Sequence, residues 1–91
     1  MLGSKAVKER IAELIAQAPE LSQNLANNHT QMAWLIAAQN TVQLVCPSET
    51  NPYHAHAKGV VVDRMARLAF KIEQISALLL PLLELHRRSL R

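Results

Sequence analysis

The sequence is poor in the residues on which several classes of protein depend. Its 91 residues include one cysteine, two glycines and a single aspartate, and aromatic residues make up 3%. A lone cysteine cannot form an internal disulfide, which excludes a disulfide scaffold. The chain also has no phosphate-cradling glycine loop, no catalytic triad and no paired-carboxylate site. We therefore expect a protein that is not an enzyme.

Long apolar runs and sorting signals are missing as well. The longest apolar run covers residues 77–83 and ends at Glu84, far short of the roughly 20 residues that a membrane span needs. Residues 1–30 have no uninterrupted apolar stretch followed by a small-residue cleavage site. Because a lone Cys46 also suits a reducing compartment, the sequence predicts a cytoplasmic protein with no transmembrane segment.

What the sequence does contain is apolar residues at helical spacing, which make up 49% of the chain when alanine and the aromatics are counted. This fraction is too high for a disordered chain, and the length suits a single domain over 1–91. The spacing predicts an all-α fold, with helices over about 4–18, 20–45 and 52–90 and a turn over 46–51. Asn51 followed by Pro52 is typical of an N-cap and a first helical residue.

Two rows of residues spaced by seven keep their phase across Pro19. One row is Leu14, Leu21, Asn28, Leu35 and Val42, and the other is Ile11, Ala18, Leu25, Met32, Gln39 and Cys46. Pro19 and Pro81 also lie at nearly equal distances from the turn. These features predict a long antiparallel helical hairpin that is kinked near both prolines. The alternative is a compact three-helix bundle in which the first helix folds back, since the polar segment 24–31 has low helix propensity.

Apolar residues occupy nearly all sides of the last helix, whereas a hairpin covers only one side of it. The sequence therefore predicts a homodimeric helical bundle, with a monomer in which the first helix covers this surface as the alternative. The predicted interface residues are Trp34, Met65, Leu68, Ile72, Ile75, Leu78, Leu79, Leu80, Leu82 and Leu83.

The net charge of +3 comes from the second half of the chain. Arg64, Arg67 and Lys71 form a basic stripe on the expected last helix, and Arg87, Arg88 and Arg91 follow at its end. These six residues are candidates for binding a polyanion through its phosphates. The alternative is an ordinary solvated face on which Asp63 pairs with Arg67. No helix-turn-helix, zinc finger or set of stacking aromatics accompanies the stripe.

His54, His56 and Cys46 are the only residues grouped as metal ligands often are. On a helix, however, residues two apart point to opposite sides. We therefore assign no metal and no cofactor, and interpret Cys46 as a small buried residue.

Taken together, these features favour a small non-enzymatic protein-binding module that acts through helix faces as a homo-oligomer. It would be an adaptor, a chaperone-like factor or an inhibitor. The alternative is a small basic nucleic-acid-associated regulator that uses the Arg64, Arg67 and Lys71 stripe. A third option is an amphipathic factor with its leucine-rich end in a membrane interface.

Overall fold

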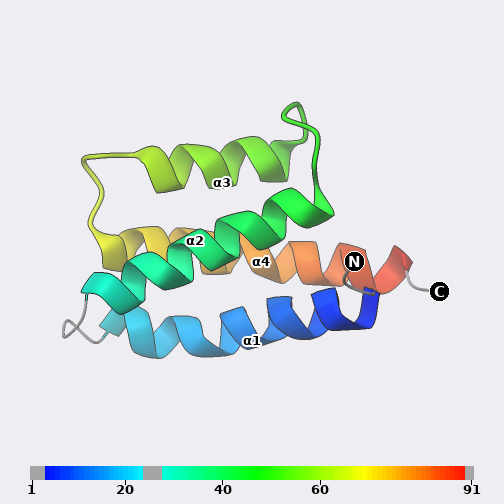
Figure 1. Cartoon of the computed structure of the whole chain (residues 1–91), viewed down its shortest axis with the longest axis horizontal. Helices are drawn as coiled ribbons and strands as arrows, with labels where there is room; N and C mark the ends of the chain where they lie inside the picture. The colour runs from blue at the N-terminus through cyan, green and yellow to red at the C-terminus, as the bar shows by residue number, and fades with distance from the viewer. Residues whose placement is uncertain (1–3, 24–27, 90–91) are drawn as a thin grey trace.

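The structure, a computed structural model, describes residues 4–23 and 28–89. These residues form four helices, α1 (Ser4–Gln23), α2 (Asn28–Val45), α3 (Pro52–Val62) and α4 (Leu68–Ser89), and no strand occurs among them. Each helix runs antiparallel to the one before it (Figure 1). The all-α class is therefore confirmed, and the topology is that of an up-down-up-down bundle.

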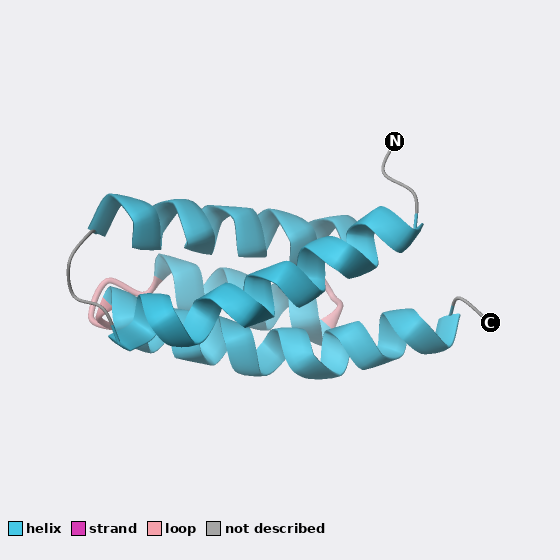
Figure 2. Ribbon diagram, turned by 90° about the horizontal axis from the view of Figure 1, so that it is seen from below, coloured by secondary structure: helices cyan, strands magenta, loops and turns pink. Residues whose placement is uncertain are grey.

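The four helices form a diamond in cross-section. α2 and α4 contact each other, and α1 and α3 each pack against both of them from opposite sides. Figure 2, seen from below, has α1 nearest the viewer between α2 and α4. The molecule measures 40 × 26 × 22 Å and has a radius of gyration of 12.7 Å. A single helix over 52–90 would alone be about 58 Å long, so the long hairpin does not describe this shape.

One apolar core lies between the helices, and α1, α2 and α4 supply most of it. α3 contributes only Ala57 among the fully buried apolar residues. The buried apolar side chains are Val7, Ile11, Leu14, Ala18, Trp34, Leu35, Ala38, Val42, Cys46, Ala57, Ile72, Ile75, Leu79 and Leu82. α3 is therefore a thin cover over one side of the α2–α4 pair.

The first difference from the predicted hairpin lies in its first arm. α1 continues through Pro19 to Gln23, and α2 then runs back along it (Figure 1). Pro19 is exposed, so its ring lies on the solvent side of the helix and does not end it. The chain reverses instead within the polar segment of low helix propensity, whose residues 24–27 lie outside the described part. In this respect the structure agrees with the alternative of a compact three-helix bundle, in which the first helix folds back.

The second difference is a break in the expected helix over 52–90. α3 ends at Val62, and Asp63 has an extended backbone with ψ of 116°. The carboxylate of Asp63 accepts a hydrogen bond from the main-chain N–H of Met65 at 2.9 Å. Such a local side-chain bond competes with helix formation, and the preceding β-branched residues 60–62 have modest helix propensity. The break lets α3 fold back over α4, which becomes a helix of its own.

Side chains fasten the short α3 at both ends. Asn51 is its N-cap, as predicted, and its Oδ1 accepts from the main-chain N–H of Tyr53 at 2.9 Å. Nδ1 of the buried His54 lies 2.8 Å from the main-chain oxygen of Cys46. At the other end, Nζ of Lys71 donates to the main-chain oxygen of Val61 at 2.8 Å. Polar contacts therefore join α3 to Cys46 after α2 and to Lys71 of α4, in addition to the apolar packing of Tyr53, Val60 and Val61 against the core.

Candidate interaction surface

Most of the predicted interface residues lie inside the single chain. Trp34, Ile72, Ile75, Leu79 and Leu82 are buried, and Leu68, Leu78 and Leu83 are half-buried against the core. Only Met65 and Leu80 are exposed. Most of the apolar circumference of α4 is covered because three helices pack against it where the hairpin supplied one, although Phe70, Leu80 and Leu85 remain exposed. The homodimer was inferred because a hairpin would leave leucines on several sides of the last helix exposed. Most of these leucines are buried or half-buried within one chain.

Trp34 fastens α2 to α1 from inside the bundle. Its indole N–H donates to the main-chain oxygen of Leu14 at 3.1 Å. One turn earlier, Nε2 of the buried Gln31 donates to the main-chain oxygen of Leu21 at 3.0 Å. Leu21 lies in the last turn of α1, where carbonyl groups lack partners within the helix. Trp34 is thus a core residue with a satisfied polar group, and its ring is not available as an exposed anchor.

The sequence analysis placed Arg64, Arg67 and Lys71 on one helix, but in the structure they do not share a helix. Arg64 and Arg67 belong to the segment between α3 and α4, and Lys71 is half-buried and donates to Val61. The side chains of Arg87 and Arg88, and all of Arg91, lie outside the described residues. Phosphate-driven binding usually uses several basic contacts, so the nucleic-acid function stays a prediction.

The three residues grouped as metal ligands also separate. His54 is buried, His56 is exposed on the other side of α3, and Nδ1 of His54 is engaged by Cys46. Within residues 4–23 and 28–89, no three His, Cys, Asp or Glu side chains converge on one point. Burial raises the pKa of the Cys46 thiol above its ordinary value, which keeps the sulfur protonated at neutral pH and makes it a poor nucleophile.

An apolar surface that the sequence analysis missed lies on the outer side of α2. Met32, Ile36 and Leu44 are large apolar residues that are 46%, 51% and 54% exposed. Together with the exposed Ala33 and Asn40 they form what we call the α2 outer face. In Figure 1 this helix lies in front of α4 and is the one nearest the viewer. Spacings of four and eight place the three large side chains along one side of the helix.

The α2 outer face contains no Lys, Arg, Asp or Glu, and the exposed His29 lies in line with it at the start of the helix. Residues 21–48 contain no Lys, Arg, Asp or Glu, and Glu20 and Glu49 bracket the stretch. Soluble surfaces are normally about 25–35% charged, and the central parts of protein interfaces are depleted of charge. This gap in the charge pattern is visible in the sequence and could have identified the surface. It was overlooked because apolar periodicity alone assigns Met32 to a buried row.

A groove runs beside this face, between α1 and α2. Its larger part, of about 470 Å³, is lined by Leu14, Gln17, Glu20, Leu21, Thr30, Ala33, Trp34 and Ala37. A smaller hollow of about 180 Å³ continues it along Arg10, Glu13, Leu14, Gln17 and Ala37. The α1 edge of the groove is charged, whereas its α2 edge consists of the uncharged residues Thr30, Ala33, Trp34 and Ala37.

A second groove, of about 320 Å³, lies between α1 and α4. It is lined by Ala18, Pro19, Ser22, Gln23, Glu73, Ser76, Ala77 and Leu80.

No described helix is long and apolar enough to cross a membrane.

Neither a protein-family model, nor a curated protein, nor a solved structure matches the chain. Function is therefore inferred from the described surface, whose most distinctive part is the uncharged α2 outer face and the groove beside it.

Proposed function

We propose that the protein is a small non-enzymatic protein-binding module that acts as a homodimer, and that the α2 outer face is its contact surface. The observation that supports this is the exposure of Met32, Ile36 and Leu44 on a helix without a charged residue. An exposed apolar row with no charges around it resembles the centre of an interface more than an ordinary solvated surface.

A second copy is the occupant that this face fits. In a two-fold dimer the same surface meets itself, and an uncharged face does so without electrostatic repulsion. Burying the remaining half of a Met, Ile or Leu side chain contributes roughly 1 kcal/mol, and a two-fold interface buries each of the three twice. The row from Met32 to Leu44 is about 18 Å long, a little under half of the 40 Å length of the molecule.

The outer face of α4 fits a second copy less well. Its exposed Phe70 and Leu80 alternate with the exposed carboxylates of Glu73 and Glu84. Two copies of this face would bring like charges together and would remove those carboxylates from water, which is costly. The charge pattern therefore favours α2 over α4 as the dimer surface.

A pair of matched substitutions tests the proposal. Ile36→Lys places a charge in the α2 outer face, and Phe70→Lys places one at an equally exposed position on α4, since the two side chains are 51% and 52% exposed. Solution mass is measured by light scattering coupled to size exclusion. We expect the wild type and Phe70→Lys to have twice the chain mass of 10.1 kDa and Ile36→Lys to be a folded monomer.

Circular dichroism confirms that each variant retains its helices, so that a loss of mass reports association. A wild-type monomer at the highest soluble concentration would refute the homodimer. A wild-type dimer that is lost in Phe70→Lys and kept in Ile36→Lys would place the interface on α4 instead.

A further inference from the structure

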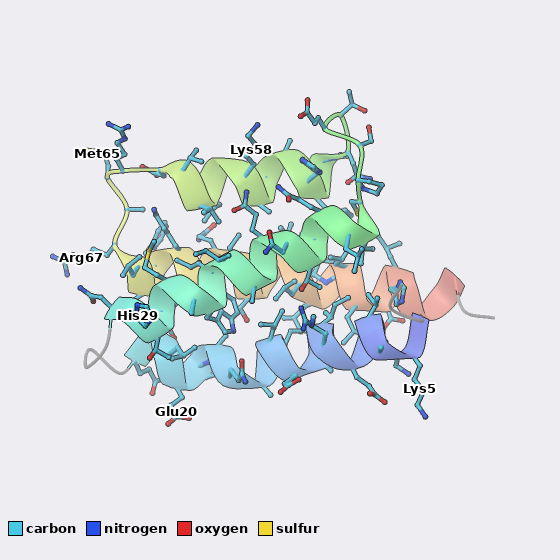
Figure 3. All side chains as sticks on the ribbon, viewed as in Figure 1. Lys5, Glu20, His29, Lys58, Met65 and Arg67 are labelled. Carbon is cyan, nitrogen blue, oxygen red and sulfur yellow. The ribbon has the colours of Figure 1, made fainter. Side chains whose placement is uncertain are left out.

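The charged edge of the α1–α2 groove has a pattern that complements itself. Arg10, Glu13, Gln17 and Glu20 follow one another at spacings of three and four, which places them on one side of α1. All four are exposed, and all four line the groove. In Figure 3, Glu20 projects from the end of α1 opposite to Lys5.

When this row is set antiparallel against a second copy of itself, every charge meets a suitable group. Arg10 faces Glu20 of the second copy, and Glu13 faces Gln17 of the second copy. Each of these contacts occurs twice, because a two-fold axis relates the copies. The centre of the arrangement lies midway between Arg10 and Glu20, at Ile15.

The exposed row on α2 has its centre at nearly the same height. This row consists of Asn28, Met32, Ile36, Asn40 and Leu44, spaced by four residues. The hydrogen bonds from Trp34 to Leu14 and from Gln31 to Leu21 fix how the antiparallel α1 and α2 are aligned. By this alignment Ile15 is level with about Leu35. Ile36 is the next residue, about 1.5 Å farther along the helix. Ile36 is the middle residue of that row, so an axis at this level sets Met32 against Asn40 and Leu44 against Asn28 of the second copy.

We propose that a second copy packs antiparallel across the α1–α2 side of the molecule, with the two-fold axis level with Ile36. In this arrangement Ile36 meets Ile36 of the second copy, and two equivalent ion pairs join Arg10 to Glu20 of the second copy. The inference rests on the proposed homodimer and adds its register and its charged contacts. It depends on the coincidence of two centres, one from the charges of α1 and one from the exposed row over residues 28–44 of α2.

Other registers are less favourable on the same evidence. An axis at Glu13 brings two like carboxylates together, and so does an axis that sets Glu13 against Glu20 of the second copy. Setting Arg10 against Glu13 of the second copy satisfies both charges. That register moves the axis to about residue 38 of α2, where Met32 faces Leu44 of the second copy, but it leaves Glu20 without an opposite charge and the first turn of α2 unpaired.

Charge reversal tests this register. Arg10→Glu, Glu20→Arg and the double variant are compared with the wild type by sedimentation equilibrium at low and moderate salt. Each single reversal replaces attraction by repulsion at two equivalent contacts. We expect the dimer dissociation constant to rise about tenfold or more at low salt, and less as salt screens the contacts. The double variant restores the pairs and should return to within about threefold of the wild type.

Lys5→Glu is the matched control, because it makes the same charge change at an exposed position of α1 away from the groove. It should leave the dissociation constant unchanged. Circular dichroism again verifies that the variants remain helical.

The outcomes separate this inference from the proposed function. If Ile36→Lys is monomeric while both single reversals dimerise like the wild type, the homodimer stands and the register is refuted. Rescue of Arg10→Glu by Glu13→Arg, with no rescue by Glu20→Arg, would refute it in favour of the shifted register. A monomeric wild type would refute both proposals.

Discussion

At the scale of single residues, a few polar side chains decide how the helices are joined. Gln31 and Lys71 each donate to a main-chain oxygen in the last turn of another helix, and His54 bonds to the residue that follows α2. Carbonyl groups at helix ends have no partner in their own helix. These side chains therefore satisfy groups that burial would otherwise leave unpaired. The sequence identified none of these contacts, because each joins residues that periodicity places on separate helices.

Trp34 gives the clearest test at this scale. Trp34→Phe keeps an aromatic ring in the core and removes the donor to the main-chain oxygen of Leu14. We expect the free energy of unfolding to fall by about 1–3 kcal/mol, from the lost hydrogen bond and the smaller ring. Urea unfolding followed by circular dichroism measures it. An unchanged midpoint would mean that the indole N–H is solvated and the contact contributes nothing to stability.

At the scale of elements, the sequence predicted which faces are buried better than it predicted where helices end. Leu14, Leu35 and Val42, from one predicted row, are all buried although the chain reverses between them. A heptad row has the same phase whether its helices continue or fold back. Phase alone therefore could not distinguish the hairpin from the folded-back arrangement.

The prediction missed the break between α3 and α4 for the same reason, because the apolar spacing continues across it. Apolar residues at alternating spacings of three and four run from Val61 to Leu82, and Ile72, Ile75, Leu79 and Leu82 of this series are buried. Val61 and Met65 keep the same spacing, but Val61 belongs to α3 and Met65 lies in the segment between α3 and α4. Asp63 and the valines before it supplied the local signal for a helix end, and the strong periodicity outweighed that signal in the prediction.

Two adjacent leucines of α4 test whether one chain covers this helix. Leu79 is fully buried, whereas Leu80 is 56% exposed. We expect Leu79→Ala to lower the free energy of unfolding by about 2–5 kcal/mol and Leu80→Ala to change it by less than about 0.5 kcal/mol. Chemical denaturation of the two variants side by side provides the comparison. Equal losses would show that the outer face of α4 is buried in the assembly and would contradict an interface on α2.

At the scale of the whole molecule, the core is complete within one chain. Buried apolar side chains come from all four helices, and no buried side-chain nitrogen or oxygen among the described residues lacks a hydrogen-bond partner. Association is therefore not needed to fill the core, contrary to the argument from the leucines of α4. Among the apolar side chains that the fold leaves exposed, those of the α2 outer face stand out because no Lys, Arg, Asp or Glu lies near them in the sequence. Apolar periodicity alone does not distinguish an exposed apolar face from a buried one.

The homodimer predicts that stability depends on concentration. If two folded chains associate and unfolded chains do not, mass action raises the unfolding midpoint as protein concentration rises. For a dimer of this size the rise should be about 4 °C for each tenfold increase in concentration. Ile36→Lys should unfold at a lower midpoint that does not change with concentration, because its core is intact and its association is lost. Differential scanning calorimetry over a hundredfold range measures both, and a wild-type midpoint that stays constant over that range would contradict the dimer.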